Sequence, residues 1–162
     1  MSKVYGLSGL RVGYLCGPPG LLEPLRALTP PWSVSLPAQV AAVHALQSPS
    51  YYEKHYEETL RLRKNLVQGL RQLGIQEIVP GVANFILFHL PADRPDAAAV
   101  IHRCREQGLF IRDAAEMGTG MGNRAIRIAV KDAETNLRML QILKRSLQTL
   151  HKNPTDTALQ ET

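Results

Sequence analysis

A lysine and an arginine near the start of the chain are the residues best suited to chemistry. Lys3 precedes Arg11 by eight positions, with Gly6 and Gly9 between them. A lysine amine can form an imine with an aldehyde when burial or a neighbouring cation lowers its pKa. An arginine guanidinium binds phosphate or carboxylate through two parallel hydrogen bonds. Solvated surface charges are the alternative, but the glycines and the apolar run that Arg11 opens favour a binding site.

Further candidates lie in the second half of the chain. Arg127 lies between isoleucines in AIRIAV, and Arg112 closes LFIRD. A charge buried in a strand without a partner is costly, so Arg127 requires an anion, either a ligand group or a glutamate of the chain. Arg124 is expected to face solvent. Asn84, in ANF, either lines a site or binds backbone where its strand begins.

Hydrophobic periodicity and turn residues outline the elements that must position these side chains. Helices are predicted for residues 20–28, 36–47, 50–73, 95–107 and 132–150, and strands for 11–16, 83–90, 109–113 and 125–130. The segment IQEIV (75–79) is strand-like, and a glycine-rich loop spans 118–122. The pattern therefore indicates an α/β protein.

Capping residues define the ends of two of the predicted helices. Ser50 and Glu53 match a capping box at the start of the long helix, and Gly74 is its expected stop. Asp132 is the expected N-cap of the last helix. One apolar face of that helix is predicted to hold Leu137, Leu140, Leu143 and Leu147.

A change of composition near residue 50 divides the chain. We expect a turn-rich part at 1–49, an α/β domain at 50–150 and a polar, disordered tail at 151–162. Strand 11–16 would lack neighbours in so short a part and would expose its edges. The chain before residue 50 is therefore expected to be loosely ordered or prone to aggregation.

Composition argues against several classes of protein. The 162 residues carry a net charge of +5 at pH 7, but the basic residues are dispersed, so no nucleic-acid partner is expected. No apolar run approaches the ~20 residues that span a bilayer, and no membrane partner is expected. Cys16 and Cys104 match no metal spacing. Both are expected to be buried, reduced thiols of a cytoplasmic protein.

The string SKVYGLSGLRVGY (2–14) resembles the cofactor-lysine segment of the fold-type I pyridoxal-phosphate (PLP) enzymes, the aminotransferase class I/II superfamily. The segments 17–46, 81–88 and 108–130 are similar to stretches of histidinol-phosphate aminotransferases and threonine-phosphate decarboxylases. The resemblance extends to about residue 150. It implies the C-terminal part of a fold-type I PLP-dependent transferase, namely the end of the large domain, at 1–49, followed by the small α/β domain.

The resemblance also implies a role for each candidate residue. Lys3 would be the catalytic residue that carries PLP, with Ser2 and Arg11 on the cofactor phosphate. The substrate-binding residues would be Arg127 for the α-carboxylate, Arg112 for a substrate phosphate, and Asn84. No metal is expected.

The activity implied is transfer of an amino group between an amino acid, such as a phosphorylated histidinol-like one, and a 2-oxo acid in amino-acid biosynthesis. A threonine-phosphate-type decarboxylase shares these residues and is the close alternative. A catalytically inert small-domain remnant is the other. In the family, residues before the lysine hold the cofactor ring, so a fragment, for instance from a truncated reading frame, is expected here. The complete enzyme would be a homodimer.

Overall fold

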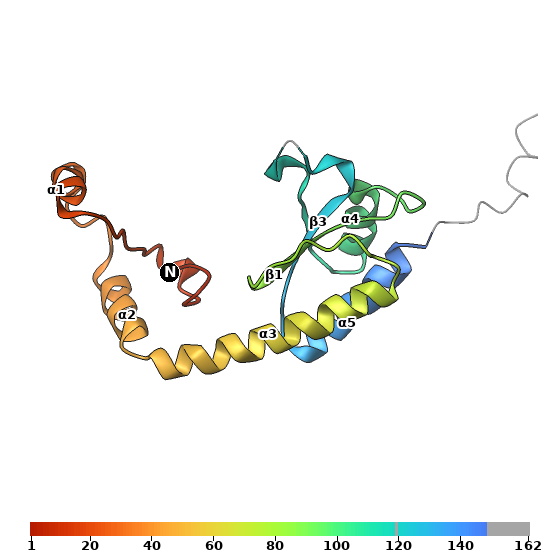
Figure 1. Cartoon of the computed structure of the whole chain (residues 1–162), viewed down its shortest axis with the longest axis horizontal. Helices are drawn as coiled ribbons and strands as arrows, with labels where there is room; N and C mark the ends of the chain where they lie inside the picture. Colours follow the sequence, from red (N-terminus) through yellow and green to blue (C-terminus); the bar gives the residue numbers. More distant parts are fainter. Residues whose placement is uncertain (119, 149–162) are drawn as a thin grey trace, which may run out of the picture. The chain divides into compact units, whose positions relative to one another are not determined.

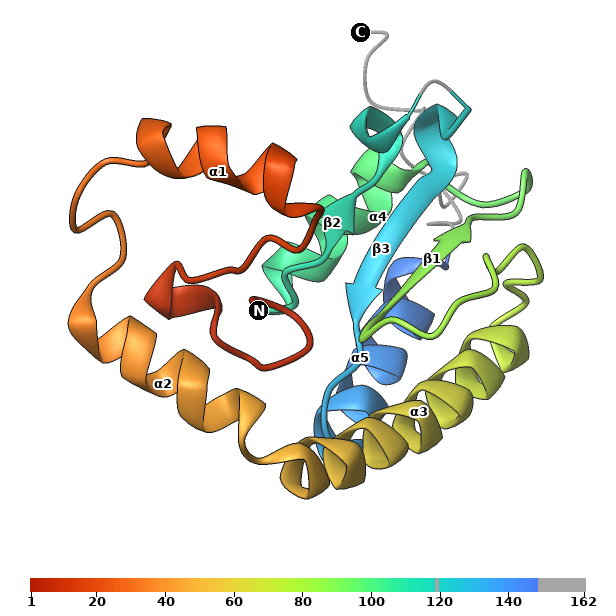
Figure 2. The same ribbon diagram turned by 60° about the vertical axis from the view of Figure 1, so that its left-hand side comes forward.

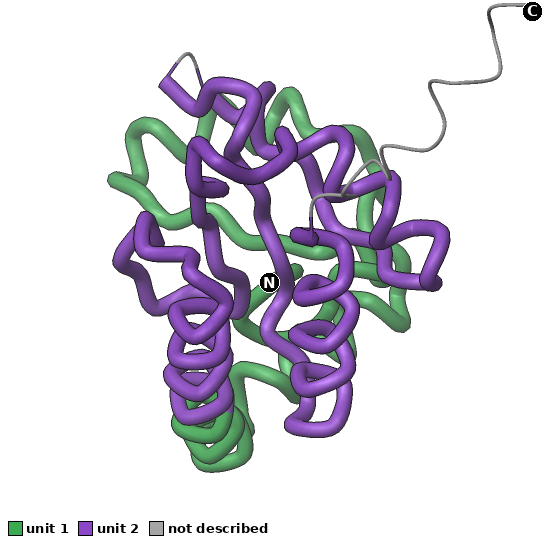
Figure 3. The backbone as a smooth tube through the Cα atoms, turned by 90° about the vertical axis from the view of Figure 1, so that its right-hand side faces the viewer, with its two compact units in different colours: residues 1–58 green, residues 59–162 purple. Residues whose placement is uncertain are grey.

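The backbone of this chain divides into two units, which Figure 3 distinguishes by colour. The structure is a computed structural model and describes residues 1–118 and 120–148. Unit 1 is Met1–Glu58, and unit 2 begins at Thr59. Helix α3 (Pro49–Gln72) belongs partly to each, so residue 50, where the composition changes, lies in its first turn (Figure 1).

Unit 1 has a small core and exposes many large apolar side chains. Its helices are η1 (Ser8–Leu10), α1 (Pro19–Leu28), α2 (Leu36–Leu46) and the start of α3. Val12 packs with Ala38 and Ala42 of α2, and little else of this unit is buried. The large apolar side chains that remain exposed are Val4, Leu10, Tyr14, Leu15, Leu21, Leu25, Leu28, Trp32, Leu36, Val40, Val43, Leu46, Tyr51 and Tyr56. This surface agrees with the expected tendency to aggregate, which stays a prediction.

The strand predicted at residues 11–16 is not formed. Residues 12–18 have no regular structure, and within the described residues no segment pairs with them. Only Val12 of the predicted strand is buried, while Tyr14 and Leu15 are exposed. A strand needs a neighbour to bind its backbone N–H and C=O groups, so an apolar run alone does not make one.

The long helix begins two residues earlier than a capping box at Ser50 would place its first helical residue. Pro49 is its first residue, so Ser50 lies inside the first turn and is not the N-cap. Proline suits a first turn because its missing N–H would have had no helical partner there. Ser48, which directly precedes the helix, donates its hydroxyl to the carbonyl oxygen of His44 in the preceding helix, at 2.9 Å.

Unit 2 is built on a three-stranded antiparallel sheet in the order β1-β3-β2. The strands are β1 (Phe85–His89), β2 (Arg112–Asp113) and β3 (Ala125–Ala129). Alternate side chains of β1 and β3 are fully buried, because one face of the pair is covered by helices. The opposite face carries Arg127.

Three helices cover the buried face: the second part of α3, α4 (Ala97–Glu106) and α5 (Ala133–Ser146), which lie near the strands in Figure 2. Phe88 of β1 is fully buried among them. The core comprises Leu66, Leu70, Ile75, Ile86, Phe88, Leu90, Ala97, Val100, Cys104, Ile126, Ile128, Met139, Ile142, Leu143 and Leu147. The predicted α/β character of this part is confirmed.

Two strand-like segments are shorter than the pattern predicted. Strand β2 holds two residues in place of the five at 109–113. The N–H of Leu109 donates to the carbonyl oxygen of Cys104, at 2.8 Å, so the chain is still closing helix α4 at that point. Segment 75–79 adds only a single bridge, Ile78 opposite Phe88, to the free edge of β1.

Aspartate side chains cap the N-terminal ends of α4 and α5. The Asp96 carboxylate accepts from the N–H of Ala99, at 2.9 Å. The Asp132 carboxylate accepts from the N–H of Thr135, at 2.8 Å, and from its hydroxyl, at 2.7 Å. These hydrogen bonds lower the pKa of Asp132. The cap predicted at Asp132 is confirmed.

The predicted apolar face of the last helix is partly wrong. Leu143 and Leu147 are buried, whereas Leu137 is 61% exposed. Leu137 precedes Leu143 by six residues, which leaves it about a third of a turn off that face. The predicted tail at 151–162 lies outside the described residues, as do positions 149 and 150.

The two cysteines differ in their surroundings. Cys104 is a buried thiol, as expected, and its burial raises the pKa above the ordinary value. Cys16 is exposed, contrary to the prediction, because the strand meant to bury it is not formed.

Helices α3 and α5 approach closely at Gly69. A Cβ atom at this position would press on the Leu140 side chain, whose Cγ would lie 3.2 Å away. We expect Gly69→Val to lower the free energy of unfolding by roughly 1–3 kcal/mol through overpacking. Urea denaturation measures the change.

Truncating Leu140 supplies the control for this effect. Gly69→Val should cost less in a Leu140→Ala background, because the atoms that collide are gone. An equal cost in both backgrounds would refute the close approach of the two helices.

Candidate active site

Lys3 lies in a tight turn at the start of unit 1. The carbonyl oxygen of Met1 accepts from the N–H groups of Tyr5, at 3.2 Å, and Leu7, at 3.4 Å. Gly6 closes the turn with φ of +67°, a left-handed conformation that glycine adopts without strain. The Lys3 side chain is exposed, and Ser2 beside it is half-buried. The lysine amine is therefore accessible to a ligand.

Arg11 follows the short helix η1 and is exposed. Its φ of 51° is left-handed, which is uncommon for a residue with a side chain. The guanidinium Nη1 donates to the carbonyl oxygen of Ser8, at 3.1 Å, which ties the side chain back to its own turn. A guanidinium has five N–H donors, so donors remain for an anion.

The donor set of unit 1 fits two of the three demands of PLP. The amine of Lys3 suits the cofactor aldehyde, and the hydroxyl of Ser2 and the guanidinium of Arg11 suit its dianionic phosphate. The third demand is an acidic partner for the ring nitrogen. Residues 1–58 contain no aspartate, and their glutamates lie on α1 and α3.

Arg112 and Arg127 are brought together by the sheet of unit 2. They stand directly opposite each other in the antiparallel pairing of β2 with β3. Side chains of such a pair lie on the same face of the sheet. Like charges in that arrangement repel each other, so an anion bound between them would relieve the repulsion.

The Arg127 side chain is half-buried and lies over the ring of Phe85, with Cζ 4.9 Å from the ring centroid. Phe85 is the diagonal cross-strand neighbour of Arg127, because the strand register places Leu87 opposite it. Among the described residues, no carboxylate lies within ion-pair distance of Arg127. The glutamate partner considered from the sequence is thus not found there, and the guanidinium can receive an external anion.

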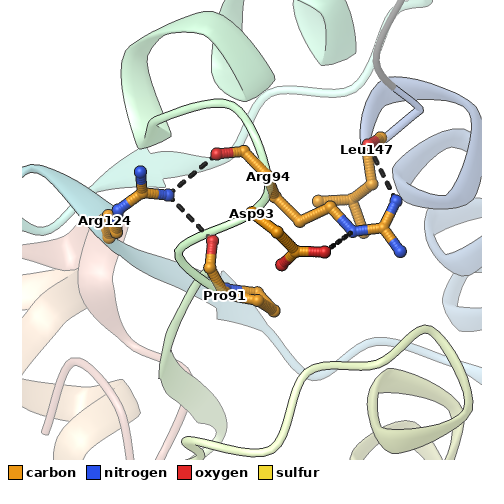
Figure 4. Close-up of polar contacts among 5 residues, drawn as sticks. All are labelled: Pro91, Asp93, Arg94, Arg124 and Leu147. Carbon is orange, nitrogen blue, oxygen red and sulfur yellow. Dashed lines mark hydrogen bonds and ion pairs between the residues drawn. The ribbon is translucent and has the colours of Figure 1, made fainter.

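Arg124, only three residues earlier, has a structural role. Its Nη1 donates to the carbonyl oxygens of Pro91, at 2.8 Å, and Arg94, at 2.9 Å (Figure 4). The side chain is half-buried, so the prediction that it faces solvent is wrong. Arg94 in turn donates to the carbonyl oxygen of Leu147, at 3.3 Å. These bonds fasten the loop before α4 to β3 and to the end of α5.

Asn84 precedes β1 and is exposed. Its carbonyl oxygen accepts from the N–H of Val130, at 2.9 Å, which continues the ladder between β1 and β3. This oxygen belongs to the main chain, so the contact does not decide between the two roles considered for the Asn84 side chain. Its role toward a substrate stays a prediction.

The structure thus places the candidates in two groups. Ser2, Lys3 and Arg11 belong to unit 1, and Asn84, Arg112 and Arg127 belong to unit 2. Sequence reasoning missed Phe85, although an aromatic residue on a strand paired with an arginine strand is a natural cation–π partner. It also missed the contacts of Tyr52 and Tyr56 with the lysine turn, which their spacing of four on one helix makes possible.

Other kinds of site are absent from the part of the chain that the structure describes. No group of three histidine, cysteine or acidic residues is placed there to hold a metal ion. None of the described helices is both long and apolar enough to cross a membrane.

Comparison with known proteins identifies the class. Residues 1–143 match the model of the family "Aminotransferase class I and II". The chain belongs to this family, whose members depend on PLP.

Individual members of the family are similar to this chain in sequence or in structure. A curated histidinol-phosphate aminotransferase 2 of Archaeoglobus fulgidus is 33% identical over 143 residues, which cover 88% of this chain and 40% of the relative. A histidinol-phosphate aminotransferase of Sinorhizobium meliloti in complex with pyridoxal-5'-phosphate has a TM-score of 0.77 at 24% identity, covering 90% of this chain and 39% of the other. L-threonine-O-3-phosphate decarboxylase of Porphyromonas gingivalis has a TM-score of 0.75 at 24% identity, covering 91% and 45%. The chain thus spans about 40% of the length of the curated relatives it matches, and these folds confirm the fold-type I character.

Proposed function

We propose that this chain carries the cofactor lysine and the substrate arginines of a PLP-dependent aminotransferase. The observation that carries the proposal is the pairing of Arg112 with Arg127 on one sheet face, in a chain that also presents Lys3 in an accessible turn. The amine substrate would carry an anionic group, such as the phosphate of histidinol phosphate, and the amino acceptor would be a 2-oxo acid, which carries an α-carboxylate. Residues 1–49 would belong to the large domain and 50–150 to the small one.

Each residue has a task that follows from its chemistry. PLP, when bound, supplies an electron sink for the carbanion at the substrate α-carbon. The Lys3 amine holds the cofactor and then moves the proton at that carbon. Ser2 and Arg11 hold the cofactor phosphate by charge-assisted hydrogen bonds. Arg11 is restrained by Ser8, which limits the entropy lost on binding.

The substrate is held by the arginine face of unit 2. The Arg127 fork binds the α-carboxylate in a bidentate manner, and the Phe85 ring supports it from one side. Arg112, on the same face, binds the phosphate of a phosphorylated substrate, and Asn84 lines the site. Through these contacts the substrate is oriented rather than chemically changed. By resemblance the complete enzyme is a cytoplasmic homodimer.

A decarboxylase of the threonine-phosphate type is the second candidate, because its substrate carries both a carboxylate and a phosphate, one for each of the two arginines. One experiment separates the two: the protein is supplied with PLP and either histidinol phosphate with 2-oxoglutarate, or threonine phosphate. Formation of glutamate supports the aminotransferase, and release of carbon dioxide supports the decarboxylase. A folded chain that retains no PLP at all would support the alternative that it is a catalytically inert remnant of the small domain.

A further inference from the structure

Two tyrosines of helix α3 contact the turn that carries Lys3. The Tyr56 hydroxyl donates to the carbonyl oxygen of Val4, at 2.9 Å, and the Tyr52 hydroxyl makes a longer, weaker bond of 3.5 Å to the carbonyl oxygen of Tyr5. The two tyrosines lie four residues apart, so they share one face of the helix. Their acceptors are the two residues that follow Lys3 in the chain.

Ring contacts reinforce these hydrogen bonds. The rings of Tyr5 and Tyr52 meet edge to face with centroids 4.8 Å apart, and the centroids of Tyr52 and Tyr56 are 6.3 Å apart. Desolvation, followed by the charges that Tyr5, Tyr52 and Tyr14 would carry if ionised, raises the pKa of Tyr56. The Tyr56 hydroxyl therefore keeps its proton, and remains a donor, throughout the neutral range.

The turn is thus held on two sides. Inside it, the Met1 carbonyl binds the N–H groups of Tyr5 and Leu7. Outside it, the two hydroxyls bind the carbonyls of Val4 and Tyr5. Lys3 lies between these anchors with its own side chain exposed.

We propose that Tyr52 and Tyr56 are positioning residues that fix the backbone after Lys3 and so direct its amine toward a bound aldehyde. The proposal rests on the proposed function for the identity of that aldehyde, PLP. Neither tyrosine touches the reacting atoms. Each acts through the turn, and restricting the turn raises the effective concentration of the amine at the reacting carbon.

Hydrogen exchange of the purified chain tests the contact itself. Tyr56→Phe keeps the ring and removes the donor, and we expect the amides of Tyr5 and Leu7 to exchange roughly two- to tenfold faster, the effect of losing one hydrogen bond. Tyr51→Phe is the matched control, because in the described structure the Tyr51 ring contacts Tyr52 and His55 and its hydroxyl does not bind the turn. Amides of β1 and β3 should not change in either variant, which excludes general destabilisation.

Covalent labelling tests the positioning. The chain is incubated with PLP, reduced with borohydride and digested, and the initial rate of labelling at Lys3 is divided by the rate at Lys64, an exposed lysine of unit 2. Tyr56→Phe should lower this ratio several-fold, and Tyr51→Phe should leave it unchanged.

Each result has a distinct meaning. Unchanged exchange in Tyr56→Phe, or equal acceleration by Tyr51→Phe, would show that the Tyr56 hydroxyl does not hold the turn that carries Lys3. Faster exchange with an unchanged labelling ratio would overturn the positioning role. Absence of label at Lys3 in the parent chain would contradict the proposed PLP function. The exchange rates would still show whether Tyr56 holds the turn.

Discussion

Lys3→Arg is expected to abolish covalent retention of PLP and to lower the amino-transfer rate by a factor on the order of 10²–10⁴ or more. Arginine keeps the positive charge and nearly the same length, so the turn and the phosphate contacts should persist. Its guanidinium is never deprotonated in proteins, however, so it can neither attack an aldehyde nor shuttle a proton. The measurement is amino transfer with added PLP, together with the PLP that remains after gel filtration.

The chain offers a close control for this substitution. Lys54, on the exposed side of α3, is the other lysine of residues 1–58. Lys54→Arg should leave both PLP retention and the transfer rate within error of the parent. Parental PLP retention by Lys3→Arg would show that the cofactor is held elsewhere.

Arg127→Lys is expected to lower kcat/KM for the amino acid and for the oxo acid by roughly 10- to 150-fold, the equivalent of about 1.5–3 kcal/mol for a lost charge-assisted hydrogen bond. Lysine retains the charge but lacks the planar fork for a carboxylate. It also loses part of the stacking on Phe85. The free energy of unfolding should change little, because no described side chain or carbonyl depends on the Arg127 donors.

Arg124 serves as the comparison for Arg127, because its hydrogen bonds are to the chain itself and not to a ligand. Its substitution by lysine removes donors from the Pro91 and Arg94 carbonyls, so it should lower the free energy of unfolding by about 1 kcal/mol and leave substrate affinity unchanged. Titration of each variant with 2-oxoglutarate, which carries the α-carboxylate, followed by NMR, separates affinity from turnover. Equal losses of affinity in the two variants would contradict the role proposed for Arg127.

The sequence predicted what local pattern determines. Alternation in AIRIAV placed Arg127 on the face opposite Ile126 and Ile128, which are buried. Asp132 was the predicted N-cap of the last helix, and that cap forms. These features depend on residues within one or two turns of chain, and such information is present in a single sequence.

The predictions that were wrong or missing depend on contacts between residues that are far apart in the sequence. The run at 11–16 has the composition of a buried strand, but no described segment pairs with it. The sequence predicted that Arg124 faces solvent, and only its hydrogen bonds to the carbonyl oxygens of Pro91 and Arg94 show that it has a structural role. The contact of Tyr56 with Val4 joins residues 52 positions apart, a separation that periodicity does not report.

The central claim is that Lys3 is the residue that binds PLP. The most direct test is borohydride reduction of the PLP-treated chain, followed by peptide mass analysis of every lysine. We predict a pyridoxyl group on Lys3 at low PLP concentration, before Lys54, Lys64, Lys131, Lys144 or Lys152 is labelled. Labelling of all these lysines at equal rates, or labelling that omits Lys3, would contradict the account.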